Sequence, residues 1–153
     1  MKSIGNATVL NQLIARLERL QPDSERRWGT MTAGELLCHL GDACEAVVGR
    51  RVPPGVSPDN RLPLPIKWLM LYSPMPFPQG VETRPGVNPK KEGSRPGEFA
   101  TDRARVIDGL RAIATASPDS VSKTHFRFGA MSLRGWQHWA YKHTDHHLRQ
   151  FGA

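Results

Sequence analysis

The sequence predicts an all-α protein, a four-helix bundle with a long proline-rich insert between its second and third helices. Two observations predict this class. Apolar side chains recur at the three-four spacing of an amphipathic helix in four segments, near residues 8–20, 32–49, 98–116 and 132–151. Eleven of the thirteen prolines fall within residues 50–97, where they deny the backbone hydrogen bonds and helical geometry.

The first two helices have clear local signals. The apolar face of the first helix consists of Val9, Leu10, Leu13, Ile14, Leu17 and Leu20. Thr32 and Glu35 have the spacing of a capping box, in which the hydroxyl and the carboxylate bond free amides at a helix start. We therefore expect the second helix to run from Thr32 to about Gly49.

The proline-rich insert holds an apolar run, Ile66–Tyr72, that is too hydrophobic for a disordered linker. We expect this run to form a short helix, with Trp68 and its neighbours packed on the bundle as a lid. Left in water, these side chains would form an exposed hydrophobic patch. Two alternatives stay open. The insert could link two domains, or its apolar run could contact a partner such as a second copy of the chain.

The third helix is expected over residues 98–116, and the fourth begins after Ser132, which can cap it, and continues to about Phe151. Between them, His125–Gly129 is short and alternating and could be extended. The sequence predicts no convincing sheet.

The chain has 153 residues and a net charge of +7, which fits one domain spanning residues 1–153 that needs no disulfide to fold. Its longest run of large apolar residues, Trp68–Tyr72, is far too short for a membrane span. Cys38 and Cys44 have the spacing of neither a redox pair nor a zinc pair, and no secretion signal is recognised, so we expect a cytoplasmic protein. Because the basic residues are spread along the chain, we expect no nucleic-acid partner. A nucleic-acid-binding module is the least favoured of the three functional hypotheses that the sequence allows.

Two histidines of the fourth helix point to a metal. At 100° per residue, His143 and His147 lie about 40° apart. Their face also carries Leu133, Trp136, Ala140 and Phe151, and the opposite face carries Arg134, His138, Asp145 and Arg149. We expect the first face to be buried and the second to be polar, with Asp145 paired to Arg149. Two buried imidazoles one turn apart can bind one ion, or each can hydrogen-bond a neighbouring helix or water.

His39 is the candidate third ligand, because it lies at the edge of the apolar stripe of the second helix beside Ala43 and Ala46. Three neutral imidazoles suit a divalent metal ion, zinc or nickel before iron or copper, and leave positions open for water or substrate. The chain contains neither His-Glu-x-x-His nor Glu-x-x-His, which excludes zinc-protease and di-iron carboxylate sites.

Three further side chains are candidate catalytic residues. Glu35 and Asp42 flank His39 on the helix, where either could orient its imidazole or act as a general base. His146 lies at the edge of the proposed site and could contact a ligand histidine or the substrate. The alternative is that all three are solvated polar residues at a helix edge.

Three stretches resemble the DinB-like (DNA-damage-inducible) superfamily, and within it a branch of unknown function. They are Trp28–Leu40, Pro76–Gly80 and Trp136–Phe151, and the last is the most specific because it ends in His-Thr-Asp-His-His-Leu-Arg-Gln-Phe. The resemblance implies a four-helix bundle with one divalent metal held by residues matching His39, His143 and His147. It also implies a homodimer, and characterised relatives include thiol-dependent transferases and isomerases that use low-molecular-weight thiols.

The sequence therefore favours a metal-dependent enzyme of the hydrolase or thiol-dependent transferase type, acting on a small molecule such as a low-molecular-weight thiol. In such an enzyme the ion polarises a substrate oxygen or sulfur, or lowers the pKa of a bound water or thiol. The alternative is a non-catalytic protein that binds a small ligand or a metal, which a closed metal coordination shell would favour.

Overall fold

A computed structural model describes residues 1–51 and 61–153, which form five α-helices, one 3-10 turn and one hairpin. The elements are α1 (Ala7–Arg19), α2 (Ala33–Val47), α3 (Leu64–Tyr72), η2 (Pro85–Val87), α4 (Phe99–Thr115), β1 (Thr124–His125), β2 (Gly129–Ala130) and α5 (Leu133–Gln150). The described chain is mostly helical, as the sequence predicts. Each of the four long helices begins and ends within two residues of its predicted range.

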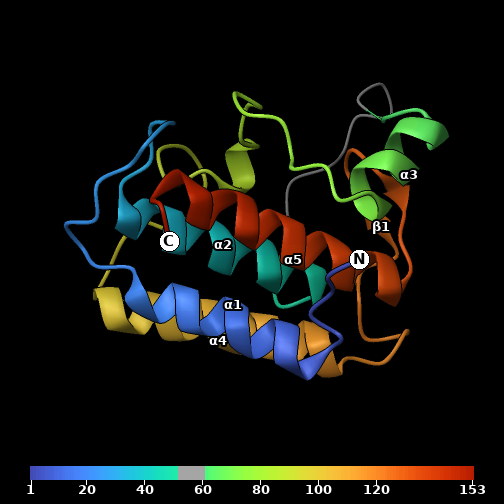
Figure 1. Cartoon of the computed structure of the whole chain (residues 1–153), viewed down its shortest axis with the longest axis horizontal. Coiled ribbons are helices and arrows are strands. Elements are labelled where there is room, and N and C mark those ends of the chain that lie inside the picture. The colour runs from blue at the N-terminus through green and yellow to red at the C-terminus, as the bar shows by residue number, and fades with distance from the viewer. Residues whose placement is uncertain (52–60) are drawn as a thin grey trace.

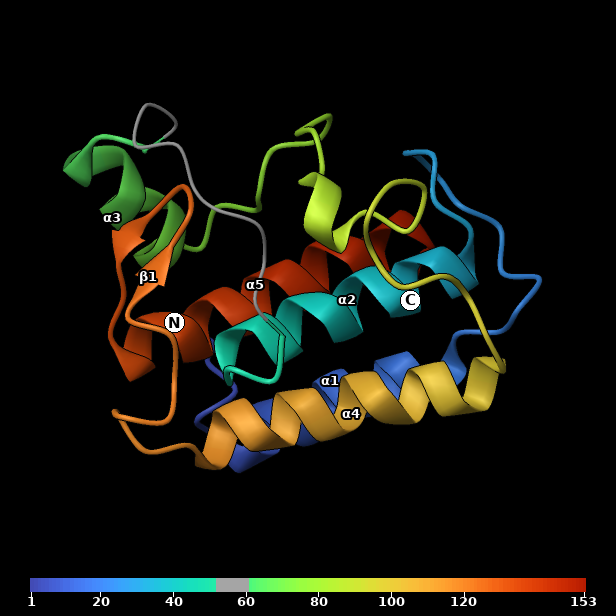
Figure 2. The same ribbon diagram turned by 180° about the vertical axis from the view of Figure 1, so that it is seen from behind.

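The four long helices lie in two layers (Figures 1 and 2). α1 and α4 run side by side in one layer, α2 and α5 form the other, and α3 and η2 lie on the outer side of that second layer. α5 contacts α1, α2, α3 and α4, so the other helices pack around it. No helix within the described ranges has the length and apolarity that a membrane crossing requires.

The interior between the layers is built mainly from leucines of the four long helices, including Leu17, Leu36, Leu40, Leu110 and Leu148, which are fully buried. Burial of this apolar stripe on each helix is the main favourable term that holds the layers together. Packing on the other layer holds α2 and α5 side by side in their own layer, and their contact determines which side chains of the two helices meet.

The helix starts are capped by side chains. Thr32 Oγ1 accepts from Glu35 N–H while the Glu35 carboxylate accepts from Thr32 N–H, which is the predicted capping box. Ser132 accepts from Gly135 N–H at the start of α5, also as predicted. Asn6 and Glu98 cap α1 and α4 in the same way.

The helix α3 packs on the second layer through one face only. Leu71 is fully buried, and Lys142 Nζ donates to the carbonyl oxygens of Met70 and Ser73 at the end of the helix. The prediction that Trp68 packs against the bundle is wrong, because Trp68 is 65% exposed. A helix of nine residues that contacts only α5 among the described helices can bury one face, and Trp68 lies on the other.

A short antiparallel hairpin precedes α5, where the sequence predicted no sheet. Thr124 pairs with Ala130 and His125 with Gly129, and Gly129 adopts a positive φ of 64° that favours glycine. Two residues per strand are too few for an alternating apolar pattern, so the sequence could only indicate an extended stretch.

Part of the opposite face of α5 is buried, which corrects in part the prediction that this face is polar and exposed, because only Arg134 and Arg149 are exposed there. His138 and Asp145 are both buried. The carbonyl oxygen of Lys2 lies 3.1 Å from His138 Nδ1, and Arg16 of α1 forms an ion pair of 2.6 Å with Asp145. The predicted pair between Asp145 and Arg149 is also present, at 2.9 Å. The N-terminal segment and α1 cover this face and supply the partners that its polar groups need.

Candidate functional site

Three histidines from two helices meet between α2 and α5. His39 comes from α2, and His143 and His147 come from successive turns of α5. One ring nitrogen from each lies within 4.8 Å of the other two, and His39 Nε2 is 3.1 Å from His143 Nε2. The structure therefore brings together the three residues that the sequence singles out as metal ligands.

The ring of His39 is held in one tautomer by the backbone. Its Nδ1 lies 2.7 Å from the carbonyl oxygen of Val87 in η2. A carbonyl oxygen only accepts, so Nδ1 carries the hydrogen and Nε2 keeps a lone pair. That lone pair faces His143, which is the orientation that a metal ligand requires.

His147 is oriented in the same manner by a side chain of its own helix. Its Nδ1 lies 2.6 Å from Gln150 Oε1, so the ring donates there and leaves Nε2 as an acceptor. His143 is held differently, because its ring stacks on Trp139 with centroids 4.6 Å apart and an interplanar angle of 17°. Each of the three rings is thus positioned by a neighbouring group.

Burial keeps these imidazoles neutral. Loss of hydration lowers the pKa of His39, and it lowers the pKa of His143 and His147 well below the usual value. The neighbouring histidines add to the effect, since each would repel a second positive ring. A neutral imidazole is the form that binds a metal, and three converging neutral nitrogens fit a divalent cation.

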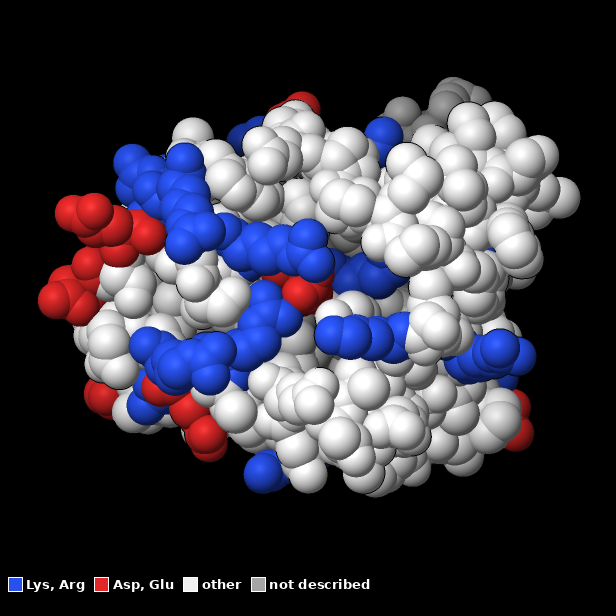
Figure 3. Space-filling view, in the orientation of Figure 1, with Lys and Arg blue, Asp and Glu red and all other residues white. Residues whose placement is uncertain are grey.

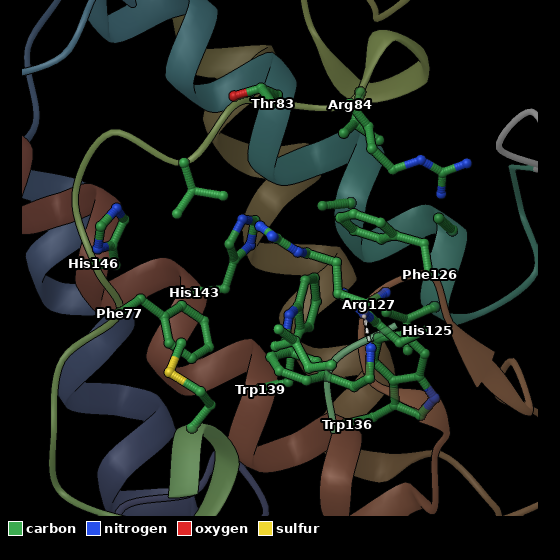
Figure 4. Close-up of a pocket in the computed structure, with 18 of the residues that line it drawn as sticks. Phe77, Thr83, Arg84, His125, Phe126, Arg127, Trp136, Trp139, His143 and His146 are labelled. Carbon is green, nitrogen blue, oxygen red and sulfur yellow. Dashed lines mark hydrogen bonds between the residues drawn. The ribbon is translucent and has the colours of Figure 1, made fainter. Parts of the chain in front are cut away.

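The histidines lie in the wall of a cavity of about 390 Å³. Most of its other walls are apolar or aromatic, and Figure 4 shows Phe77, Phe126, Trp136 and Trp139 around it. The hairpin and the segment that follows α3 line it as well, so elements far apart in the sequence form one pocket. A cavity of this size and polarity can hold a small molecule and exclude most of the water around it.

Of the three candidate catalytic residues, only His146 lines the cavity. Its ring packs edge-on against Trp28, with centroids 4.7 Å apart. Glu35 serves in the capping box of α2 and lies 3.7 Å from Lys90 Nζ. The partner of His39 Nδ1 is Val87 O, and neither Glu35 nor Asp42 takes that place.

Asp42 is fully buried and lies in an ion-pair network outside the cavity. Its carboxylate accepts from Ser94 N–H and Oγ–H and pairs with Arg105 at 2.6 Å and Arg51 at 3.2 Å. Arg51 also donates to the carbonyl oxygen of Gly86, next to Val87. Asp42 is therefore linked through Arg51 to the segment whose Val87 carbonyl oxygen bonds His39.

The two cysteines are poor candidates for a catalytic nucleophile. Both are buried, and burial raises the pKa of Cys38 and of Cys44 to about 12. A thiol with such a pKa is almost never a thiolate at neutral pH. A sulfur nucleophile at this site would have to come from a bound ligand.

Sequence reasoning missed several residues of the site. Gln150 carried a usable signal, because it lies three positions after His147 and therefore on the same side of α5. Val87 carried no signal in the sequence, because any residue supplies a carbonyl oxygen. His125 and Arg127 lie on the unpredicted hairpin, and the pocket includes them only because the hairpin folds over α5.

Comparison with known proteins gives one match. The model of the DinB superfamily matches residues 6–151. No curated protein and no solved structure matches the chain. The matched range includes the three histidines and all of the described residues that line the cavity.

Proposed function

The chain belongs to the DinB superfamily, and on that premise we propose that His39, His143 and His147 bind one divalent metal ion for an enzyme acting on a small molecule. The observation that carries the proposal is the convergence of three neutral ring nitrogens in the wall of a cavity. Zinc and nickel are the first candidates, and iron and copper also bind imidazole. The helices that hold these ligands belong, in this proposal, to a four-helix bundle.

The residues around the ligands define what the site could do. A divalent cation bound there would act as a Lewis acid, polarising a ligand oxygen or sulfur and lowering the pKa of a bound water or thiol. Val87 and Gln150 hold two of the imidazoles in the tautomer that presents Nε2. His146 is the candidate placed to accept a proton from a molecule in the cavity, because it lines that cavity and Glu35 and Asp42 do not.

Two observations favour a hydrolase or a thiol-dependent transferase. The apolar and aromatic walls would exclude bulk water around the reacting group. Both cysteines of the chain are buried and protonated, so a thiol involved in the reaction would enter as a low-molecular-weight ligand. The same apolar walls also suit the second candidate function, a non-catalytic protein that binds a small ligand.

Elemental analysis of protein purified without a histidine tag tests the metal proposal. We expect one divalent ion per chain, and we expect loss of most of the metal in His39→Ala, His143→Ala and His147→Ala proteins. His138→Ala is the matched control, since His138 bonds the Lys2 carbonyl on the other side of α5, so it should lower stability and leave the metal content unchanged. Full metal content in the three ligand variants, with each still folded by circular dichroism, would refute the proposal.

Turnover of metal-loaded and metal-stripped protein on thiols and on simple esters and amides separates the two candidate functions. An enzyme should lose turnover when it is stripped, and His146→Gln should keep the metal and lose activity. Full metal content without turnover on any of these substrates would favour the binding protein.

We also propose that the chain forms a homodimer through α3. Five of the seven large apolar side chains that are exposed in the described ranges lie in or just after this helix, namely Leu64, Ile66, Trp68, Leu69 and Met75. A wide area over α3 carries almost no charge (Figure 3). A second copy offers the same apolar surface, so a two-fold contact would bury both patches at once.

A further inference from the structure

Arg127 reaches into the cavity, and its guanidinium has no hydrogen-bond or ion-pair partner among residues 1–51 and 61–153. Arg127 lies between the two strands of the hairpin, and its side chain extends into the cavity (Figure 4). A half-buried guanidinium in an apolar pocket has lost part of its hydration, and an anion would compensate for that loss.

His125, in the first strand, adds a second donor. Its Nδ1 accepts from the backbone N–H groups of Arg127 and Phe128, at 3.0 and 3.2 Å. Nδ1 is therefore unprotonated, and the hydrogen of the neutral ring is on Nε2. The ring lines the cavity and is fixed by contacts with Phe126, Trp136 and Trp139. Nε2–H has no acceptor among the described residues, so it is available to a ligand.

The charges around this end of the cavity are positive. Arg84, Arg127 and Lys67 all lie close enough to His125 to disfavour a positive charge on its ring. Among the described residues that line the cavity, the one carboxylate is Glu82, which is 84% exposed and pairs with Lys91. An anionic group would be attracted here by the nearby cations, with little opposition from that carboxylate.

We propose that Arg127 and His125 Nε2–H form a subsite for the carboxylate of a small acid whose other end reaches the three-histidine cluster. A planar guanidinium and one imidazole N–H suit the two oxygens of a carboxylate, and the aromatic and aliphatic walls suit a short carbon chain between the two ends. The second half of the proposal rests on the proposed metal function. The carboxylate subsite itself does not depend on metal binding, because its donors lie on the hairpin.

The subsite is tested first in metal-free protein, with hexanoate and the neutral, nearly isosteric hexanamide as probes in calorimetric titrations at low salt. We expect wild-type protein to bind hexanoate about tenfold more tightly than hexanamide, as for a charge-assisted hydrogen bond. Arg127→Met should abolish this preference and Arg127→Lys should keep part of it. Arg111→Met is the control, because Arg111 is exposed on α4 and its loss changes the net charge equally. Equal binding of acid and amide by wild type, or an unchanged preference in Arg127→Met, would overturn the subsite.

The bridging arrangement is tested with 6-sulfanylhexanoate and its amide on protein loaded with Co²⁺, whose thiolate absorption reports sulfur binding. We expect Arg127→Met to weaken binding of the acid about tenfold, to leave binding of the amide unchanged and to keep full metal content. Full metal content with equal acid and amide binding would reject the bridge and leave the metal proposal intact. A preference for hexanoate in a protein that binds no metal would support the subsite, reject the bridge and reject the metal proposal.

Discussion

At the scale of single residues, the structure explains how two of the histidines are presented. His39 and His147 each direct Nδ1 at a carbonyl-type oxygen, from Val87 and from Gln150. Such oxygens fix the tautomer and leave Nε2 free, as is common for histidines that bind metals. This arrangement makes Gln150 a positioning residue whose role can be measured.

Gln150→Leu should lower the affinity for the metal about tenfold to a hundredfold, because His147 loses the acceptor that orients its ring. Gln150→Glu keeps an oxygen in that place and should retain most of the affinity. Competition with a chromogenic chelator measures both variants. Gln12→Leu, on the exposed face of α1, is the control, and an equal loss of affinity in that protein would contradict the assignment.

His125 should make stability depend on pH. Burial, with help from nearby cations, lowers the pKa of its ring to about 3, against 6.5 for the unfolded chain. Between these pH values the unfolded chain binds a proton that the folded chain does not, so the free energy of unfolding falls as the pH is lowered from about 6.5 towards 3. The slope from this one residue should be about 1 kcal/mol per pH unit.

Urea unfolding of metal-free protein at several pH values between 4 and 7 measures that slope. His125→Asn keeps an acceptor near the Arg127 and Phe128 amides and has no titratable ring, so its stability should depend less steeply on pH. The other histidines are present in both proteins, so their contribution to the pH dependence cancels in the difference between the two slopes. Identical slopes would show that His125 does not titrate as described.

At the scale of elements, one buried carboxylate joins three parts of the chain. Asp42 of α2 pairs with Arg105 of α4 and bonds Ser94, and Arg51 links it to the loop that carries Val87. Removing the charge would leave Arg51 without its carboxylate partner inside the protein and would leave Arg105 paired with Glu45 alone. Breaking a buried ion pair costs far more than breaking an exposed one, because the remaining charges stay desolvated.

Asp42→Asn should therefore lower the free energy of unfolding by about 3 kcal/mol or more, measured by urea titration. Asp108→Asn is the matched control, since Asp108 pairs with Arg50 on the surface at 2.5 Å and should cost less than about 1 kcal/mol. Equal effects of the two substitutions would argue against the network as described. Weaker metal binding by Asp42→Asn is also expected, because the loop that orients His39 would be less firmly held.

At the scale of the whole molecule, the exposed face of α3 makes the oligomeric state testable. We expect wild-type protein to sediment as a dimer at micromolar concentration and Trp68→Glu to sediment as a monomer, because a buried carboxylate without a partner is costly. Ser117→Glu adds the same charge at an exposed site beyond α4 and should stay dimeric. A monomeric wild-type protein, or a dimeric Trp68→Glu protein, would exclude α3 as the contact.

Much of the helical structure was predictable because its signals are local. The three-four spacing of apolar residues and the caps at Thr32 and Ser132 depend on neighbours within one or two turns, so the sequence located these helices closely. The hairpin was not predictable, because two-residue strands leave no periodic signal and are held by pairing and by packing over α5. The inner face of α5 was predicted, whereas the burial of His138 and Asp145 on the opposite face was not, because a helix projection ranks these two residues by polarity alone.

Helix periodicity in the sequence indicates which side chains share a face, and so which histidines could act together: His143 with His147 on one helix, and His39 on another. Which polar groups could be buried was visible in the folded chain alone, because burial depends on partners distant in the sequence. Asp145 forms an ion pair with Arg16, Asp42 forms one with Arg105, and His39 donates a hydrogen bond to the Val87 carbonyl oxygen. This difference arises because hydrophobic periodicity and capping act over a few residues, whereas a buried charge or hydrogen bond is satisfied only when separate segments come together.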